Sequence, residues 1–310
     1  MSGACSATST AIIICASSAS DARDVVSGGS RSALLTTLAL LAFAGNSLLC
    51  RLALTRTTID PAGFTTIRLL TGAVMLGAIV AVRRTPRAGS WASAAALFTY
   101  ATAFSFAYTQ LSTGTGALLL FGAVQATMIS VGVARGERLA AMQGAGLALA
   151  YAGLVALVLP GLSAPPFGAA LLMLVAGAAW GVYSLRATGA GDPTAVTAGN
   201  FLRAVPMALL ISLLWQSHHS LDVTGAVYAA TAGALASGVG YAIWYTALRD
   251  LRATSAATVQ LSVPVLAALA GVILLDEPLT PRLMLAGAAI LGGVALVVNV
   301  PRPRTTQVVE

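Results

Sequence analysis

The chain has 310 residues, a net charge of +7 and 57 % hydrophobic residues, but only 9 % charged residues. An ordinary soluble domain carries roughly 25 % charged residues, so this composition excludes a water-soluble fold, a disordered chain and a nucleic-acid-binding protein. All 17 basic residues are arginine, and in a membrane protein such an excess sets the orientation of the helices. Cys5, Cys15 and Cys50 are too few and too scattered to predict a disulfide framework or a metal site.

The chain begins with a segment rich in serine, alanine and threonine, in which no basic residue precedes Arg23. It lacks the positive start and long apolar stretch of a signal peptide, so residues 1–32 are predicted to form a mobile cytoplasmic tail. A second short tail is predicted at residues 301–310. Between the tails, a bilayer core of roughly 30 Å needs about 20 apolar residues per helix, and ten such runs follow. They are residues 33–52, 62–82, 91–111, 114–134, 140–159, 166–185, 194–215, 223–248, 254–275 and 281–299.

The arginines predict how these ten helices are oriented. If the N-terminus is cytoplasmic, twelve arginines lie at inner ends or in the tails, and only Arg51, Arg56 and Arg282 lie at outer ends. Arginine is enriched on the cytoplasmic side of membrane proteins. We therefore expect both termini to be cytoplasmic in a bacterial-type inner membrane, which requires an even number of crossings.

The two halves of the chain share a pattern. Glu137-Arg138-Leu139 follows the fourth apolar run and Glu277-Pro278-Leu279 follows the ninth, while Asp60-Pro61 and Asp192-Pro193 precede the second and the seventh. Five helices per half is an odd number, so the halves at residues 33–160 and 161–300 would have opposite orientations in the membrane. Inverted repeats of this kind are typical of secondary transporters, with a solute site near the midplane. The predicted fold is an all-α polytopic membrane protein with ten helices in two inverted five-helix repeats.

Three short sequence motifs, together with the helix pattern, indicate a resemblance to a known family. They are Phe43-Ala44-Gly45-Asn46-Ser47, Trp180-Gly181-Val182-Tyr183, and Pro264 followed by Glu277-Pro278-Leu279. With five helices in each half, the chain resembles the ten-helix EamA-type branch of the drug/metabolite transporter superfamily over about residues 33–300. Val124 departs from the proline that the family often has in the fourth helix. The resemblance implies the export of small metabolites, amino acids among them.

Three polar residues inside the apolar runs are candidates for solute binding. Asn46 lies on one face of the first helix with Phe43 and Cys50, and is expected either to line a pocket or to bond a neighbouring helix. Arg68 and Arg203 lie inside the second and seventh helices, where a lipid-facing charge is expensive. Either arginine is expected to meet a solute carboxylate or, in the alternative, helix-end carbonyls, Asn200 or the membrane interface.

Aromatic residues form three stripes at helical spacing. One includes Phe104 and Tyr108 after Tyr100, the second is Trp180 and Tyr183, and the third is Tyr241, Trp244 and Tyr245. Such stripes are either ordinary packing or the wall of a pocket suited to aromatic solutes and to ammonium groups. With the resemblance, this favours a bulky apolar or aromatic amino acid as the solute.

Gln260 and two prolines complete the predicted site. Proline removes a helix hydrogen bond, so Pro264 frees the carbonyl of residue 260 and Pro206 that of residue 202. We expect Gln260 to face the solute, and the two prolines to act as hinges or only as packing kinks.

All ten acidic residues lie in tails or at helix ends, where Glu137 and Glu277 are expected to pair with Arg138 or Arg282 or to cap neighbouring helices. Without a mid-membrane carboxylate, we predict facilitated transport or exchange by alternating access, with a proton-coupled exporter of cationic drugs as the alternative. No catalytic, metal or cofactor-binding motif occurs, so neither an enzyme nor a cofactor is expected. The glycine-rich fifth and tenth helices are expected at the periphery of a monomer or a homodimer.

Overall fold

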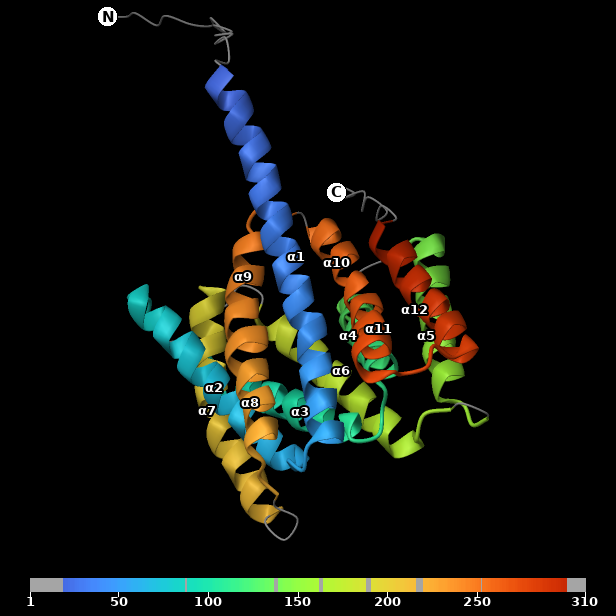
Figure 1. Cartoon of the computed structure of the whole chain (residues 1–310). Coiled ribbons are helices and arrows are strands. Elements are labelled where there is room, and N and C mark those ends of the chain that lie inside the picture. The colour runs from blue at the N-terminus through green and yellow to red at the C-terminus, as the bar shows by residue number, and fades with distance from the viewer. Residues whose placement is uncertain are drawn as a thin grey trace, which may run out of the picture.

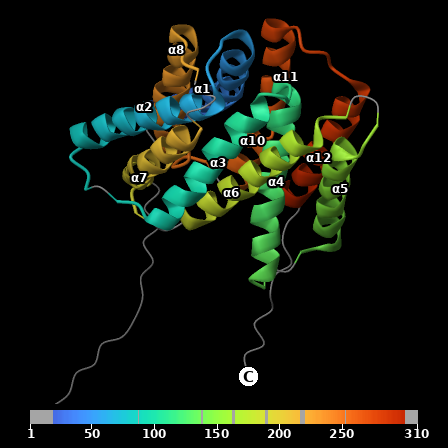
Figure 2. The same ribbon diagram turned by 90° about the horizontal axis from the view of Figure 1, so that it is seen from below.

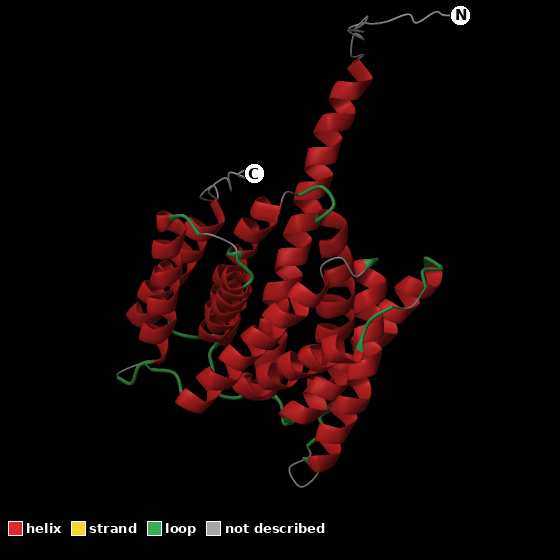
Figure 3. Cartoon of the chain, turned by 180° about the vertical axis from the view of Figure 1, so that it is seen from behind, coloured by secondary structure: helices red, strands yellow, loops and turns green. Residues whose placement is uncertain are grey.

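A computed structural model of the chain describes residues 19–86, 88–136, 139–161, 164–187, 191–215, 220–251 and 253–299. Throughout these ranges the secondary structure is helical and contains no strand (Figure 3). Among the described residues, nine helical segments are long and apolar enough to cross a membrane, and the more polar α3, which includes Ser, Thr and Tyr, supplies the tenth predicted crossing. The helices are α1 (Ala19–Arg56), α2 (Pro61–Val82), α3 (Trp91–Tyr108), α4 (Thr113–Ala134), α5 (Ala141–Val158), α6 (Phe167–Ala187), α7 (Pro193–Leu214), α8 (Val223–Thr231), the π-helix η2 (Ala232–Val239), α9 (Gly240–Ala247), α10 (Ala253–Gln260), α11 (Ser262–Leu275) and α12 (Pro281–Asn299).

The ten predicted crossings are confirmed, with three local differences. α1 begins at Ala19, so residues 19–32, which the sequence assigned to a tail, are helical, because no proline precedes Pro61 and extending a helix is easier than starting one. Residues 1–18 and 300–310 lie outside the described ranges. The eighth crossing is divided into α8, η2 and α9, and the ninth is divided at Leu261 into α10 and α11.

The contacts between helices repeat across the two halves. The most extensive contacts join α5 with α12, α3 with α6, α2 with α7, and α4 with α6. Helices five crossings apart are thus partners in three pairs, since α4 also packs on α11. The contact of α3 with α6 has its counterpart in that of α8, η2 and α9 with α1, and the contact of α4 with α6 has its counterpart in that of α11 with α1. This reciprocity is the packing expected of two equivalent five-helix units.

The bundle has two distinct ends. The pair of α5 and α12 lies at one end and the pair of α2 and α7 at the other, with α1, α3, α4 and α6 between them (Figures 1 and 2). α1 begins and α12 ends on the same side (Figure 1), which we call the terminal face. The opposite side is the distal face, where α1, α3, α5, α7 and α11 end.

Helix starts follow the sequence signals. Asp60 and Asp192 are the N-caps of α2 and α7, where their side chains accept hydrogen bonds from backbone N–H groups, and each is followed by a proline in the first turn. Six crossings precede α7 but only one precedes α2, so the two Asp-Pro motifs lie at opposite faces. Equivalent signals therefore begin two helices of opposite direction that pack on each other.

Small residues bring the helices close together. A Cβ atom on Gly177 would approach within 2.6 Å of the Leu120 carbonyl oxygen, so α6 packs tightly on α4. At the α5–α12 contact, a Cβ on Gly146 would lie 2.7 Å from the Gly293 carbonyl oxygen. A side chain of any size at these positions requires the helices to separate.

We predict that Gly293→Ala destabilises the protein. Its Cβ would meet the carbonyl oxygen of Gly146 and lie 2.7 Å from the backbone nitrogen of Ala150, and such overpacking costs about 1–3 kcal/mol. Gly292→Ala is the matched control because a Cβ there has no atom within 4 Å, and alanine favours a helix by up to about 1 kcal/mol. Thermal unfolding in detergent should show a lower Tm for Gly293→Ala alone, and equal Tm values would contradict the packing argument.

Candidate functional site

The three aromatic stripes predicted from the sequence meet in one cluster. Along α3, the ring centroids of Tyr100 and Phe104 are 5.4 Å apart and those of Phe104 and Tyr108 are 4.7 Å apart. Trp180 on α6 joins this stripe to the others, because its ring lies 4.8 Å from Tyr100 and 5.4 Å from Tyr241. Each stripe occupies a different helix, so the contacts depend on the packing of α3, α6 and α9.

The cluster extends from Trp180 in two directions. Trp180 stacks on Tyr183, with 5.1 Å between centroids and 28° between planes, and the Tyr241 and Tyr245 centroids are 6.3 Å apart. On α1, Phe43 lies 5.7 Å from both Tyr241 and Trp244. All the predicted aromatic site residues thus belong to one connected set of rings, which we call the aromatic cluster; it consists of Phe43, Tyr100, Phe104, Tyr108, Trp180, Tyr183, Phe201, Tyr241, Trp244 and Tyr245.

Arg68 lies against this cluster and is almost completely buried. Only 1 % of its surface is exposed. The guanidinium carbon is 5.2 Å from the ring centroid of Tyr100 and 4.9 Å from that of Phe104, which is within cation–π distance. Nε and Nη1 have no hydrogen-bond partner among the described residues. A buried cation with free donors is costly, so this position favours an anion.

The backbone of Arg68 is fixed by the π-helix. A Cβ on Gly233 in η2 would collide with the carbonyl oxygen of Arg68 and the hydroxyl of Thr71, so α2 and η2 are in backbone contact at this point. The π-helix was not predicted, although Gly233, Gly238 and Gly240 in one short segment were a signal for close backbone approach. π-helical turns are frequent at functional sites.

Asn46 adds a free acceptor beside the free donors of Arg68. Its Nδ2 donates to the Tyr100 hydroxyl at 3.4 Å, and its Oδ1 has no partner among the described residues although Asn46 is only 7 % exposed. Tyr100 therefore contacts Asn46 through its hydroxyl and Arg68 through its ring. Cys50, one turn further along α1, is fully buried and belongs to the same core.

A hydrogen-bonded group closes the cluster toward the terminal face. The Tyr183 hydroxyl donates to Thr197 Oγ1 at 3.3 Å, and Thr197 shares a hydrogen bond of 2.9 Å with the Tyr245 hydroxyl. Asn200 Nδ2 donates to the Tyr183 hydroxyl at 3.4 Å, and Asn200 Oδ1 accepts from the backbone N–H of Ser90 at 2.9 Å. Thr197 was missed by sequence reasoning, although its i, i+3 spacing with Asn200 on α7 was a signal.

Arg203 differs from Arg68. Its Nη1 donates to the carbonyl oxygens of Ala88 and Gly199, at 3.1 and 2.9 Å, and the residue is half-buried. These contacts tie α7 to the connection before α3 and match the alternative that assigned the arginine to carbonyl groups. Arg68 is therefore the arginine in contact with the aromatic cluster.

The two predicted hinge prolines differ, because the helix is interrupted before Pro264 but continues through Pro206. Pro264 lies in the first turn of α11, and Gln260, half-buried, is the last residue of α10 before the interruption at Leu261. The missing N–H of Pro264 accounts for this break. α7 continues through Pro206. The sequence thus located a break at Pro264, and motion at either proline stays a prediction.

An ion pair lies on the distal side of the cluster. Arg51 Nε is 3.3 Å from Glu277 Oε1, and Arg51 Nη1 donates to the carbonyl oxygens of Tyr108 and Thr109 at 2.8 and 3.1 Å. Glu277 Oε2 accepts from the backbone N–H of Thr113 at 2.7 Å, at the start of α4. The expected capping of a neighbouring helix by Glu277 is therefore confirmed, and its partner is Arg51.

Arg282, one of the two arginines expected to pair with a glutamate, does not bind Glu277. Arg282 instead donates to the carbonyl oxygens of Ala156 and Leu159 at the end of α5. Glu137 and Arg138 lie outside the described residues. Arg51 was singled out in the sequence only as an exception to the arginine bias, and that exception was the signal for its structural role.

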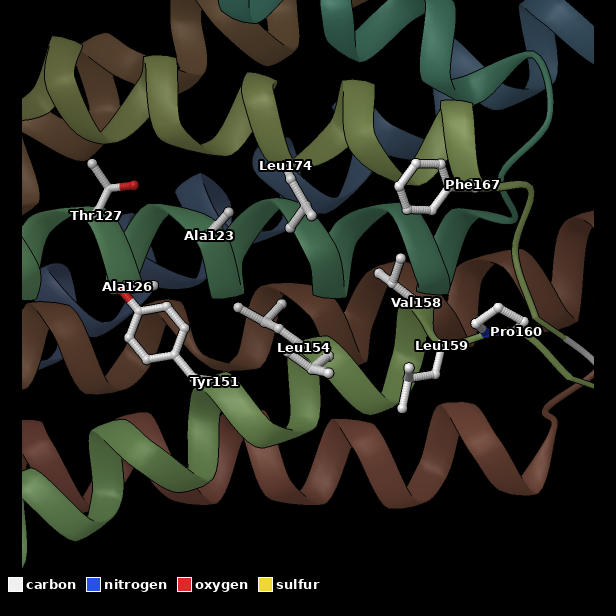
Figure 4. A pocket seen from close by; sticks show the side chains of 11 residues that line it. Ala123, Ala126, Thr127, Tyr151, Leu154, Val158, Leu159, Pro160, Phe167 and Leu174 are labelled. Carbon is white, nitrogen blue, oxygen red and sulfur yellow. The ribbon is translucent and has the colours of Figure 1, made fainter.

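A cavity of 460 Å³ lies to one side of this region, between α4, α5 and α6 (Figure 4). Its walls are almost entirely apolar, and Tyr151 and Phe167 at its rim are 41 % and 67 % exposed. None of the predicted site residues lines it. Within the described ranges, no three His, Cys, Asp or Glu side chains are grouped closely enough to hold a metal ion.

Comparisons with known proteins agree with this architecture. The EamA-like transporter family matches residues 167–299, which span α6 to α12. The uncharacterized protein PA1977 of Pseudomonas aeruginosa (strain PAO1) is 58 % identical over 270 residues, which cover 86 % of this chain and 94 % of that protein. A solved structure titled "Crystal structure of protein" superposes with a TM-score of 0.61 at 19 % identity, covering 86 % of this chain and 96 % of the other, and so shares its fold.

The apolar helices and the relatives together define a polytopic helical membrane protein. The chain belongs to the EamA-like transporter family, within the drug/metabolite transporter superfamily. It is accordingly a membrane transporter, whose partners are a small-molecule solute and the lipid bilayer.

We predict that the fluorescence of two of the four tryptophans responds to a solute bound in the aromatic cluster. Trp180 and Trp244 belong to the cluster, whereas Trp91 is 60 % exposed and Trp215 packs on Phe106 with 5.1 Å between centroids. Titration of purified protein with phenylalanine should change the emission of a Trp91→Phe/Trp215→Phe variant. If the emission changes only in a folded Trp180→Phe/Trp244→Phe variant, in which Trp91 and Trp215 remain, the solute binds outside the aromatic cluster.

Proposed function

We propose that the protein exports amino acids with bulky apolar or aromatic side chains by alternating access between its two halves. The observation that carries this proposal is the buried guanidinium of Arg68, which has free Nε and Nη1 donors and lies on the rings of Tyr100 and Phe104. A carboxylate at this point would accept charge-assisted hydrogen bonds and neutralise the buried charge.

The surroundings of Arg68 fit the remaining parts of an amino acid. The free Oδ1 of Asn46 is an acceptor for an ammonium group. The rings of the aromatic cluster offer offset and edge contacts to an aromatic side chain. In this proposal Asn46 and Arg68 orient the charged end, while Phe104, Tyr108, Trp180, Tyr183, Tyr241, Trp244, Tyr245 and Gln260 pack around the body of the solute.

The same guanidinium disfavours the alternative solute class. The buried site already contains the positive charge of Arg68. A cationic drug would bring a second positive charge close to it, and like charges repel strongly at low dielectric constant. The described carboxylates Asp60, Asp192 and Asp222 cap helices at the membrane faces. We therefore propose facilitated diffusion or exchange in preference to coupling through a mid-membrane carboxylate.

The proposed orientation places the terminal face in the cytoplasm of a bacterial-type cell. Two of the three arginines expected outside have specific partners, since Arg51 binds Glu277 and Arg282 binds carbonyl groups of α5. Their presence at the distal face therefore has a structural reason, and the remaining arginine bias supports cytoplasmic termini. Export is then movement from the terminal face to the distal face.

Proteoliposomes test the transport mode. Vesicles loaded with unlabelled phenylalanine should take up labelled phenylalanine without any ion gradient, and more slowly when the interior is empty, because exchange accelerates a carrier. Transport that requires a proton gradient would overturn the facilitative mechanism and favour the coupled alternative. Single-channel conductance would instead indicate a pore.

We predict that Arg68→Gln selectively impairs solutes that carry a carboxylate. Hydrogen bonds to charged groups contribute about 1.5–3 kcal/mol, so the preference for phenylalanine over phenylalaninamide should fall about tenfold or more. Arg203→Gln is the control, because its partners are the carbonyls of Ala88 and Gly199, and it should leave this ratio unchanged. If Arg203→Gln alters the ratio and Arg68→Gln does not, Arg203 is the carboxylate partner.

A further inference from the structure

Four elements converge at the distal face next to the aromatic cluster. Arg51 belongs to α1, Tyr108 and Thr109 end α3, Thr113 begins α4, and Glu277 follows α11. The first three elements lie in the first five crossings and Glu277 in the second five. The contacts between Arg51 and Glu277 and between Glu277 and Thr113 therefore connect the two halves of the protein.

The local fold holds Glu277 in place. Asp276 adopts a left-handed conformation with φ of 55°, and the backbone N–H of Glu277 donates to the Gly271 carbonyl at 3.2 Å. The backbone N–H of Asp276 donates to the same Gly271 carbonyl, so this carbonyl and the left-handed residue together end α11 and fold Glu277 back over the last turn of the helix. A Cβ on Gly271 would collide with Glu277 Oε2, so the carboxylate occupies this position only because residue 271 is glycine.

The carboxylate satisfies two groups at once. Oε1 faces Arg51 Nε at 3.3 Å, while Oε2 accepts from Thr113 N–H at 2.7 Å, where the positive end of the α4 dipole favours a negative charge. Only 18 % of the Arg51 side chain and 12 % of the Glu277 side chain are exposed. Partial burial strengthens such a pair relative to an exposed one, and separation leaves two poorly solvated charges.

These contacts border the aromatic cluster directly. Arg51 binds the carbonyl oxygen of Tyr108 at 2.8 Å, and the ring of Tyr108 packs 4.7 Å from Phe104, on which Arg68 lies. Cys50, the residue before Arg51, is fully buried in the same core. The ion pair thus stands between the cluster and the distal face.

We propose that Arg51 and Glu277 form a gate that closes the aromatic cluster to the distal face, and that the protein opens to this face only when the two side chains separate. The pair joins helices from opposite halves, so relative movement of the halves must break it together with the cap on α4. The proposal of a gate does not depend on which solute the protein transports.

Labelling of Cys50 tests this gate. In a Cys5→Ser/Cys15→Ser background, Cys50 is the remaining thiol, and its reaction with a water-soluble methanethiosulfonate in detergent requires opening. The labelling rate follows the population of the open state. Glu277→Gln keeps an oxygen for Thr113 N–H but removes the ion pair, so the rate should rise about tenfold. An unchanged rate in the folded variant would overturn the proposal.

Gly271→Ala gives a second test that keeps both charges in the sequence. Its methyl group displaces the Glu277 carboxylate, and we expect an increase in Cys50 labelling similar to that of Glu277→Gln. The double variant Gly271→Ala/Glu277→Gln should label no faster than either single variant, because both changes open the same gate. Multiplied effects would contradict a shared mechanism.

Arg282→Gln is the matched control on the distal face. Arg282 also contacts backbone carbonyls there, but those of Ala156 and Leu159 at the end of α5, which are not among the contacts of Arg51 or Glu277. Its substitution should leave Cys50 labelling unchanged, and an equal increase would indicate general loosening instead of gating. Because labelling requires no solute, failure of this test and failure of the proposed amino-acid transport are separate results.

Discussion

The candidate site depends on an arginine side chain that is buried among aromatic rings inside an apolar bundle and has no counter-ion among the described residues. The rings of Tyr100 and Phe104 offset part of the cost of removing Arg68 from water, since a cation–π contact contributes about 0.5–2 kcal/mol. The free Nε and Nη1 donors leave the rest uncompensated. In the proposed site a solute carboxylate completes these interactions, and the acceptor of Asn46 beside the same tyrosine sets the direction in which the solute is oriented.

The same packing that buries Arg68 also links its environment to both membrane faces. Toward the distal face, Tyr108 connects the aromatic cluster to Arg51 and Glu277. Toward the terminal face, Tyr183 and Tyr245 connect it to Thr197 and Asn200. The two closures differ chemically, because one uses an ion pair that joins the halves and the other uses neutral hydrogen bonds. Opening toward the distal face therefore carries the larger electrostatic cost.

Periodicity and composition predicted the crossings because apolar runs of about 20 residues have few alternatives in a bilayer. They also predicted the aromatic stripes, since each stripe is a local property of one helix. Which arginine contacts the stripes is decided by packing between helices distant in sequence. Arg68 and Arg203 have similar sequence contexts, but Gly233 lets η2 approach the backbone of Arg68 closely, whereas Arg203 reaches the carbonyl of Ala88. The division of the eighth crossing into α8, η2 and α9 could not be predicted either, because it also depends on packing between helices that are distant in sequence.

The equivalence of the two halves explains why Arg51 and Arg282, which lie at the distal face against the arginine bias, have bonding partners there. Helices five crossings apart pack on each other, so residues that end helices in one half meet residues that begin helices in the other. Glu277 follows α11 and caps α4, its equivalent helix, which leaves its second oxygen for Arg51 on α1. A carboxylate placed in this way compensates a helix end and an arginine that the orientation rule disfavours at that face. The inverted repeat thus supplies both the symmetry of the bundle and the pair of charges that joins its halves.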